Sequence, residues 1–214
     1  MKKNILFRLF AYIGLFSIIT DFFLIVIMGI FVPNYNPIKQ YISELGSSIN
    51  PNAWLINYWW SIYSFLMLTF TYGLYITIKK NKYGWLGPLL LCLDFIGNGL
   101  LSGLFKCDIG CHGNSFSNIS HYIFSAIGTI TATFAPLGLY FGIKKDPRWK
   151  LFKRRLILLA IILIVSFLIM AYFELFVLFS YSFAFSGLTQ RIHTVIYYWF
   201  LLQISGKLLK ILKK

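Results

Sequence analysis

Acidic residues are scarce in this sequence: only six aspartates and glutamates accompany 20 lysines and arginines in a chain of 214 residues. Charged residues of both signs make up 12% of the chain, whereas a soluble domain contains about a quarter. Hydrophobic residues make up 58%, and the mean hydropathy is +0.73. The shortage of charge excludes an ordinary soluble domain and favours a protein that lies within a lipid bilayer.

Familiar catalytic motifs are absent as well. The sequence contains no G-x-S-x-G or H-E-x-x-H pattern, no P-loop and no dinucleotide-binding glycine pattern. It therefore indicates no particular reaction and no cofactor, and whether the protein is an enzyme stays open.

Six long apolar runs divide the chain, each close to the roughly 20 residues that a helix needs to cross a bilayer. Lipid offers no partner to backbone polar groups, so a spanning segment must be a helix or part of a closed barrel. The runs do not alternate between apolar and polar residues as barrel strands do. We therefore predict an all-α fold, a six-helix transmembrane bundle that forms one integral membrane domain over residues 1–214. The predicted spans are residues 8–32, 55–78, 84–105, 118–142, 156–176 and 188–206.

The lysines and arginines between these runs are distributed unequally. Only three of the 20 lie at one set of helix ends, namely Lys39, Lys106 and Arg191. The other 17 lie at the opposite ends: Lys2, Lys3, Arg8, Lys79, Lys80, Lys82, Lys144, Lys145, Arg148, Lys150, Lys153, Arg154, Arg155, Lys207, Lys210, Lys213 and Lys214. Cytoplasmic loops of membrane proteins carry the excess of positive charge. We therefore predict a multi-pass protein of the cell (plasma) membrane with both the N and the C terminus in the cytoplasm.

The net charge of +14 does not require a nucleic-acid partner. A basic surface can bind phosphate backbones, but these charges lie at membrane edges, where anionic lipid headgroups attract them. The densest cluster, residues 144–155, fits a topology anchor. Membrane lipids are therefore the expected partners, nucleic acid is not, and protein partners are unknown.

A few polar residues lie inside the predicted spans, where charge is rare. Asp21 lies near the middle of the first span and Asp94 near the middle of the third. Asn98 and Ser102 follow Asp94 at intervals of four residues, so the three side chains share one face of a regular helix. Hydrogen bonding between helices is the favoured interpretation. A proton or cation relay and a place in a catalytic or ligand site are the alternatives.

Most of the remaining polar chemistry lies at the outer ends of the helices. All three histidines and four of the six acidic residues lie on this side or in its half of the bilayer. His121 begins the fourth span and recurs at helical spacing with Ser125 and Gly128. Small residues let helices approach closely. An equally simple interpretation is therefore that His121 has only a structural place, at the end of a face that packs against another helix, with its ring bonded to a carbonyl.

Two cysteines, Cys107 and Cys111, lie in one outer loop beside His112. We predict a disulfide between them, because this loop faces an oxidising compartment. Free thiols and a metal site that includes His112 are the alternatives. No second pair of ligands follows in the sequence, so no metal is predicted.

Short motifs lie at successive outer loops, in residues 42–46, 51–55 and 103–108 with Cys111, then at His121, then in residues 187–191. They resemble a bacterial and archaeal family of six-pass membrane proteins known as a domain of unknown function. The family pattern reads I-S-x-L-G, then F-P-x-D, then a histidine at the next helix start, then G-L-x-Q-R; Lys106 stands where the family usually has proline. The family is also distantly similar to eukaryotic six-pass proteins of the DRAM/Sfk type, which are associated with membrane-lipid organisation and autophagy.

The resemblance implies that Ser43, Asp108, His121, Gln190 and Arg191 act together on the outer side. Asp108 and His121 are the candidate catalytic residues, as an acid–base pair. Arg191, Ser43 and Gln190, with Glu174, are the candidate binding residues. Arg191 is expected to form an ion pair with Asp108 or Glu174, or to hold a phosphate or carboxylate.

Two classes of function fit these residues. In the first, the protein binds or modifies a lipid-like molecule at the outer leaflet. In the second, it is a non-catalytic transporter or membrane assembly partner, and its polar cluster is structural or a proton path. The two differ in geometry, because the first requires an open cavity within reach of lipid and the second requires none.

Overall fold

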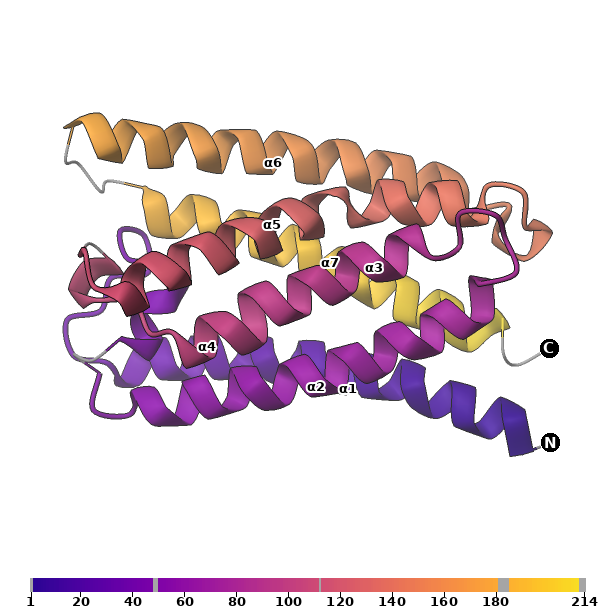
Figure 1. The fold of residues 1–214 in the computed structure, drawn as a ribbon, viewed down its shortest axis with the longest axis horizontal. Helices are drawn as coiled ribbons and strands as arrows, with labels where there is room; N and C mark the ends of the chain where they lie inside the picture. The colour runs from indigo at the N-terminus through magenta and orange to yellow at the C-terminus, as the bar shows by residue number, and fades with distance from the viewer. Residues whose placement is uncertain (1, 48–49, 112, 181–184, 212–214) are drawn as a thin grey trace.

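The computed structural model describes residues 2–47, 50–111, 113–180 and 185–211, and within these ranges it contains helices and no strand (Figure 1). The all-α prediction is therefore confirmed. The long helices are α1 (Lys2–Phe31), α2 (Ala53–Ile78), α3 (Leu86–Asp94), α5 (Phe116–Ile143), α6 (Phe152–Ser180) and α7 (Ser186–Ile211). A π-helical segment, η2 (Phe95–Leu101), and the short α4 (Ser102–Leu104) continue α3. Single 3₁₀ turns form η1 (Ile42–Gly46), η3 (Ile109–Cys111) and η4 (Pro147–Trp149).

Five helical segments in the described ranges are long and apolar enough to cross a membrane: Phe7–Phe31, Ala53–Ile78, Leu86–Leu104, Phe116–Ile143 and Phe152–Leu175. They coincide with the first five predicted spans. The sixth predicted span falls on α7, which has 26 residues, as many as α2, but is less apolar. Part of the polarity of α7 is turned inward, because His193, Tyr197 and Tyr198 are buried.

The third span is not a regular α-helix, because η2 interrupts it. The Ser102 hydroxyl donates a hydrogen bond to the carbonyl of Gly97, five residues earlier, at 2.8 Å. Gly97 has no room for a side chain, since a Cβ atom there would lie 2.6 Å from the carbonyl oxygen of Phe124 in α5. The expectation of a regular helix from Asp94 to Ser102 is therefore wrong. Turns of π-helix inside α-helices are often found at functional sites.

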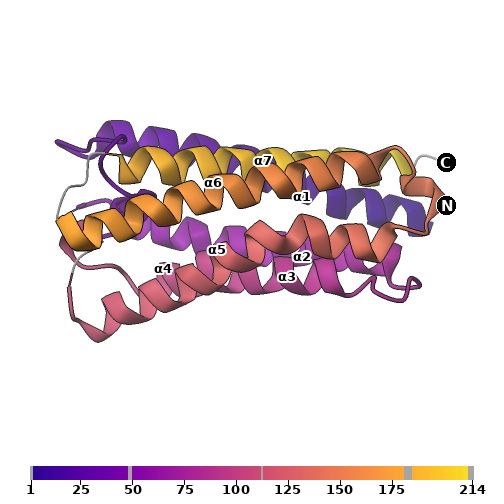
Figure 2. The ribbon, with the colours of Figure 1, turned by 90° about the horizontal axis from the view of Figure 1, so that it is seen from above.

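The helices form one bundle whose two ends differ. α1 packs against α2 and α7, and α5 packs against α3 and α6. Figures 1 and 2 show both termini at one end of the bundle, called the terminal end below. The loop with η1 lies at the opposite end, called the distal end, and α5 and α6 diverge toward it (Figures 1 and 2).

Large apolar side chains occupy both the interior and the outward faces of the bundle. Those that are fully buried include Phe70, Phe95, Phe200, Ile18 and Leu91. On the outward faces of α1 and α6, Phe16, Ile30, Leu158 and Leu168 are each at least 58% exposed. So much exposed apolar surface is typical of a face that meets lipid.

At the terminal end, an ion pair joins Arg148 to Asp146 at 2.7 Å, the one ion pair in the described part of the chain. Arg148 also donates a hydrogen bond to the carbonyl of Thr77 at 3.0 Å. Hydrogen bonds from the Arg148 guanidinium lower the pKa of Asp146 below its ordinary value. The turn between α5 and α6 is thereby joined to the end of α2.

Candidate functional site

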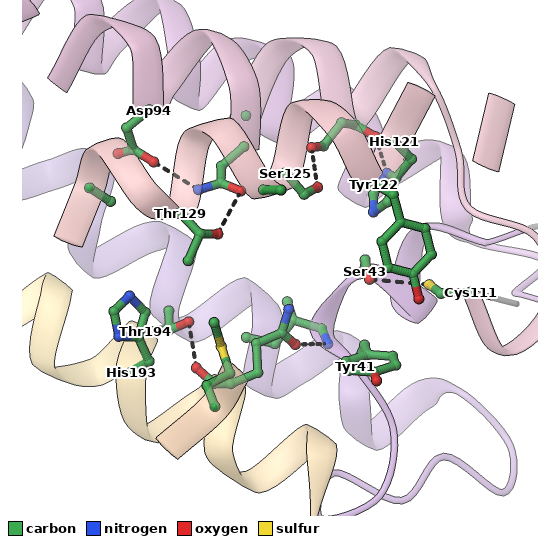
Figure 3. Close-up of a pocket in the computed structure, with 18 of the residues that line it drawn as sticks. Tyr41, Ser43, Asp94, Cys111, His121, Tyr122, Ser125, Thr129, His193 and Thr194 are labelled. Carbon is green, nitrogen blue, oxygen red and sulfur yellow. Dashed lines mark hydrogen bonds between the residues drawn. The ribbon is translucent and has the colours of Figure 1, made fainter. Parts of the chain in front are cut away.

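A cavity of about 990 Å³ lies among the helices, on the distal side of the bundle's middle (Figure 3). Its lining extends from Ser43 and Asn114 in the distal loops to Asp21 and Asp94 near the middle of their spans. Residues of α1, α2, α3, α5, α6 and α7 all contribute. The cavity therefore joins the distal end of the bundle to its centre.

The cavity opens between α5 and α6. On α5, the lining includes Ile119, Ile123 and Ile130, which recur at helical spacing and are 48%, 53% and 44% exposed. On α6, it includes Leu175, which is 55% exposed. Lining residues that are also exposed mark the mouth of a cavity, and this mouth lies where the two helices diverge. This part of the mouth is therefore apolar and opens sideways, whereas Gly113 and Asn114, which also line the cavity and are exposed, extend the mouth to the distal loop.

The part of the cavity nearest the middle of the bundle contains the carboxylates of Asp21 and Asp94. Both residues are buried, with exposed fractions of 3% and 2%. Asp21 accepts hydrogen bonds from the indole N–H of Trp59, at 2.8 Å, and from the Tyr198 hydroxyl. Asp94 accepts hydrogen bonds from the Tyr197 hydroxyl and, at 2.9 Å, from the Asn98 amide. Successive residues of a helix point about 100° apart, so two adjacent tyrosines of α7 can reach two different helices.

A line of polar groups follows α3 and α5 from this floor toward the distal end (Figure 3). The Thr129 hydroxyl donates a hydrogen bond to the side-chain oxygen of Asn98 at 3.4 Å. The hydroxyls of Ser102 and Ser125 lie 2.8 Å apart. Despite the π-helical segment, Asp94, Asn98 and Ser102 all line the cavity. The predicted common face is therefore present.

His121 lies at the distal end of this line and is only 5% exposed. Its Nδ1 lies 2.8 Å from the carbonyl oxygen of Phe105 and 3.1 Å from that of Ser102. Carbonyl oxygens only accept hydrogen bonds, so Nδ1 carries the proton and Nε2 of the neutral ring is an acceptor. Among the described residues Nε2 has no hydrogen-bond partner, and the imidazole lines the cavity. The backbone thus fixes the ring with one acceptor available to a ligand.

The other histidine that the structure describes, His193, lies on the opposite wall of the cavity (Figure 3). Its ring nitrogens lie 2.9 Å from the Ser166 hydroxyl and 3.4 Å from the Thr133 hydroxyl. It therefore ties α7 to α5 and α6. His112 lies outside the described residues.

The loop with η1 covers the distal end of the cavity through contacts with α6 and α7. The Tyr41 hydroxyl donates a hydrogen bond to Glu174 at 2.8 Å, and burial raises the pKa of Tyr41 above its ordinary value. The backbone N–H of Ile42 donates to the side-chain carbonyl of Gln190 at 2.7 Å. The hydroxyl oxygen of Ser43 lies 3.2 Å from the sulfur of Cys111. Of the candidate binding residues, Ser43, Glu174 and Gln190 all line the cavity.

Arg191 is placed differently from what the sequence suggested. Its guanidinium donates hydrogen bonds to the carbonyls of Gln40 and Gly187, at 2.7 and 3.0 Å, and to the Tyr35 hydroxyl. It also lies over the Tyr35 ring, with 5.4 Å between the guanidinium carbon and the ring centre. It pairs with no carboxylate in the described chain and does not line the cavity. The expected ion pair with Asp108 or Glu174 is wrong, because the carbonyl of Gln40 in the covering loop and that of Gly187 in α7 hold the Arg191 guanidinium instead.

Asp108 also lies away from the cavity lining. Its carboxylate accepts hydrogen bonds from the hydroxyl of Ser115, at 2.8 Å, and from the backbone N–H of the same residue at 3.4 Å. Its own N–H donates to the Asn118 side chain at 2.9 Å. Asp108 therefore shapes the turn that begins α5, and in the described structure it makes no contact with His121. The expected acid–base pair is not assembled.

The structure joins Cys107 and Cys111 in a disulfide. The two sulfurs and a ring nitrogen of His121 lie within 4.8 Å of one another, so the reduced chain has three potential metal ligands here. Thiolates bind metal ions, and a disulfide removes both of them. With the disulfide formed, Cys107 and Cys111 are not available to a metal ion, and their bond cross-links the distal loop.

Several lining residues carried no signal in the sequence. Among them are Tyr41 and the two tyrosines of α7, which together donate a hydrogen bond to every acidic side chain of the lining. A pair of adjacent tyrosines within a predicted span was the one available sign, because tyrosine is usually found at the membrane surface.

Long apolar helices around a cavity that contains buried polar groups define a helical membrane protein. A family model described as "Protein of unknown function (DUF998)" matches residues 15–205, and the chain belongs to this family. The resemblance to a family of unknown function is thereby confirmed, whereas its motif pattern and the kinship with DRAM/Sfk-type proteins stay predictions. Neither the curated proteins nor the solved structures contain a match to this chain.

Proposed function

We propose that the protein is a six-pass protein of the cell membrane that holds a lipid-like molecule in the cavity between α5 and α6. In this proposal α7 is the sixth span, the terminal end is cytoplasmic and the distal end faces outward. Membrane lipids are the partners, and the ligand enters from the outer leaflet. Modification of the ligand would use His121, whereas Asp108 has no direct part.

The observation that carries the proposal is a cavity with a lateral apolar opening and a few polar groups in its interior. A lipid-like molecule has to leave the bilayer sideways, so its site needs an opening at the level of the acyl chains. Ile123 and Ile130, which lie inside the span Phe116–Ile143, provide an apolar rim, and Leu175 lies at the distal end of the facing span. Inside, His121 and Ser125 offer hydrogen-bonding groups to a polar headgroup.

The topology is supported by the positions of the basic residues. The loop of residues 79–85 and the turn of residues 144–151 lie at the terminal end of the bundle and contain seven of the 20 lysines and arginines, whereas the loops at the distal end contain Lys39 and Lys106. The inward polarity of α7 supports a sixth span, because His193, Tyr197 and Tyr198 are buried among the other helices. Polar groups that face a bundle interior are tolerated in spanning helices.

One observation favours the second class of function, in which the polar residues only hold the bundle together. Each carboxylate oxygen of Asp21 and Asp94 already accepts a hydrogen bond from another side chain. Such contacts stabilise a bundle without any ligand. They do not account for an open cavity beside them, so the two possibilities are separated by what the cavity holds.

The test is to identify what is retained when the full-length protein is purified in a mild detergent. Lipid extracts of the wild type are compared with those of Ala171→Trp, which places an indole among the lining residues of α6. The matched control is Ile169→Trp on the same helix, since Ile169 is 49% exposed and outside the lining. We expect a molecule retained in stoichiometric amount by the wild type and the control, but lost from Ala171→Trp. Equal retention by all three proteins would contradict the proposal.

A further inference from the structure

The cavity has an unusual charge for this protein. Its lining includes Asp21, Asp94 and Glu174, which are three of the six acidic residues of the chain. None of the described lysines and arginines lines it, although the chain has 20 of them and a net charge of +14. Acidic groups have been concentrated in the cavity of a strongly basic protein.

The basic residues nearest in sequence to the lining are unable to supply the missing charge. Arg191 is held by the carbonyls of Gln40 in the covering loop and Gly187 in α7, and it lies outside the lining. Lys106 is exposed at the distal end and outside the lining. In the described part of the chain, Asp21 and Asp94 therefore have hydrogen-bond donors but no cation within salt-bridge distance.

Carboxylates near the middle of a bilayer are costly unless another charge or a proton neutralises them. Neutral donors such as Tyr197 and Tyr198 reduce that cost, yet they supply no positive charge. Aromatic rings line the same space, among them Trp60 and Tyr63. Aromatic faces attract cations and have no comparable preference for anions.

We infer that the ligand of this cavity carries a positive charge: it is an amphipathic amine whose ammonium group is held by Asp94 and Asp21 and whose apolar chain leaves between α5 and α6. Glu174 lies at the distal end of the lining, where an ammonium group would meet it on entry. This inference rests on the proposed function, because it names the chemical class of the molecule that the cavity holds. It replaces the anionic headgroup that Arg191 was expected to bind.

The inference is tested with three probes of equal chain length: dodecylamine, dodecanol and dodecanoate. The full-length protein is placed in nanodiscs of a zwitterionic lipid, and each probe competes with radiolabelled dodecylamine. Dodecylamine that still binds in Ala171→Trp is counted as partition into the lipid and is subtracted. Ile169→Trp is the control that an added indole outside the lining does not change binding of the probe. The charge of the whole protein works against the expected result, because +14 attracts the carboxylate nonspecifically.

We expect the amine to bind about tenfold more tightly than the alcohol, as one charge-assisted hydrogen bond would give, and the carboxylate to bind most weakly. Asp94→Asn should remove most of this preference while keeping a partner for the Tyr197 hydroxyl. The matched control, Asp146→Asn, removes an equal charge at the terminal end and should leave the preference unchanged. The preference among the three probes is measured on the wild type, and Ala171→Trp serves only to define the background of partition into lipid.

Two other outcomes are separable. If all three probes bind equally in the part that Ala171→Trp abolishes, or if the carboxylate binds best, the inference is overturned and the proposed function stands. If no probe shows binding that depends on Ala171, the proposed function fails as well.

Discussion

Tyr198 of α7 donates its hydroxyl hydrogen bond to Asp21 of α1, and thereby fastens the last helix of the chain to the first. The neighbouring residue, Tyr197, makes the same kind of bond to Asp94 of α3. Both bonds are buried near the centre of the bundle. α7 is the least apolar of the long helices that the structure describes, so these bonds explain how it is retained in the interior.

Removing either hydroxyl should therefore destabilise the bundle. Tyr198→Phe leaves one oxygen of Asp21 without a donor, and a hydrogen bond to a charged group contributes about 1.5–3 kcal/mol, or less where the membrane-embedded unfolded state finds other partners. We expect a lower unfolding midpoint in a thermal or denaturant titration of the detergent-solubilised protein. Tyr72→Phe is the control, since Tyr72 is 58% exposed on α2. Equal midpoints for both variants would contradict a structural role for this bond.

The close packing of η2 against α5 gives a second prediction. In Gly97→Ala, the new methyl group would lie 2.6 Å from the carbonyl oxygen of Phe124, so α5 has to move. We expect a loss of stability of about 1–3 kcal/mol from this overpacking, seen as a lower melting temperature. In Gly206→Ala, nothing lies within 4 Å of the new atom. That control should be neutral or slightly stabilising, because alanine favours a helix.

The topology predicts that the two ends of the bundle differ in their accessibility from outside the cell. A cysteine in place of Asn114 in the distal loop should react with a membrane-impermeant maleimide on intact cells. One in place of Asn81 in the loop between α2 and α3 should react only after the cells are opened. The wild type, with its own three cysteines, is the control for background labelling. Labelling of the Asn81 position alone would reverse the orientation.

The fold could be predicted from the sequence because the bilayer leaves few choices. Apolar runs of this length must be helices, and all six fall on helices in the described residues, five of them apolar enough to cross a membrane. The π-helical segment could not be predicted, since its cause is tertiary. Ser102 and Gly97 are compatible with a regular helix until α5 packs directly against them.

The candidate site could be predicted only where a charge interrupts an apolar run. Asp21 and Asp94 stood out for that reason, but Tyr197 and Tyr198 did not, because aromatic residues make up 20% of the chain. The partner of Arg191 was missed for another reason. The position of Arg191 along its helix suggested that carboxylates were near. Its acceptors are two backbone carbonyls and the Tyr35 hydroxyl, and they are in reach because of the path of the covering loop. That path cannot be predicted from the types of side chain.

The disulfide is a further expectation that can be measured directly. Cys107 and Cys111 close the distal loop beside Ser43, and an outward-facing loop is oxidised. Peptide mapping of protein isolated without reductant should find the two cysteines linked. Cys92, which is half-buried and unpaired, is the internal control and should be alkylated after denaturation. Alkylation of all three residues without reduction would show that the loop is open.

The last prediction concerns Arg191, which joins α7 to the loop that covers the cavity. Its guanidinium donates to the carbonyls of Gln40 and Gly187 and to Tyr35, and burial raises the pKa of Tyr35 to about 12. Tyr35 therefore stays protonated at neutral pH, and its contribution to stability should fall only as the pH rises above the ordinary tyrosine value, because ionisation then favours the unfolded chain.

Arg191→Ala should lower the unfolding free energy by about 1.5–3 kcal/mol and loosen the covering loop. Lys39→Ala in the same loop removes an equal charge and, by contrast, should change it by less than about 0.5 kcal/mol. Thermal unfolding, with limited proteolysis of residues 32–47, compares the two variants; matching curves and equal cleavage rates would rule out this role for Arg191.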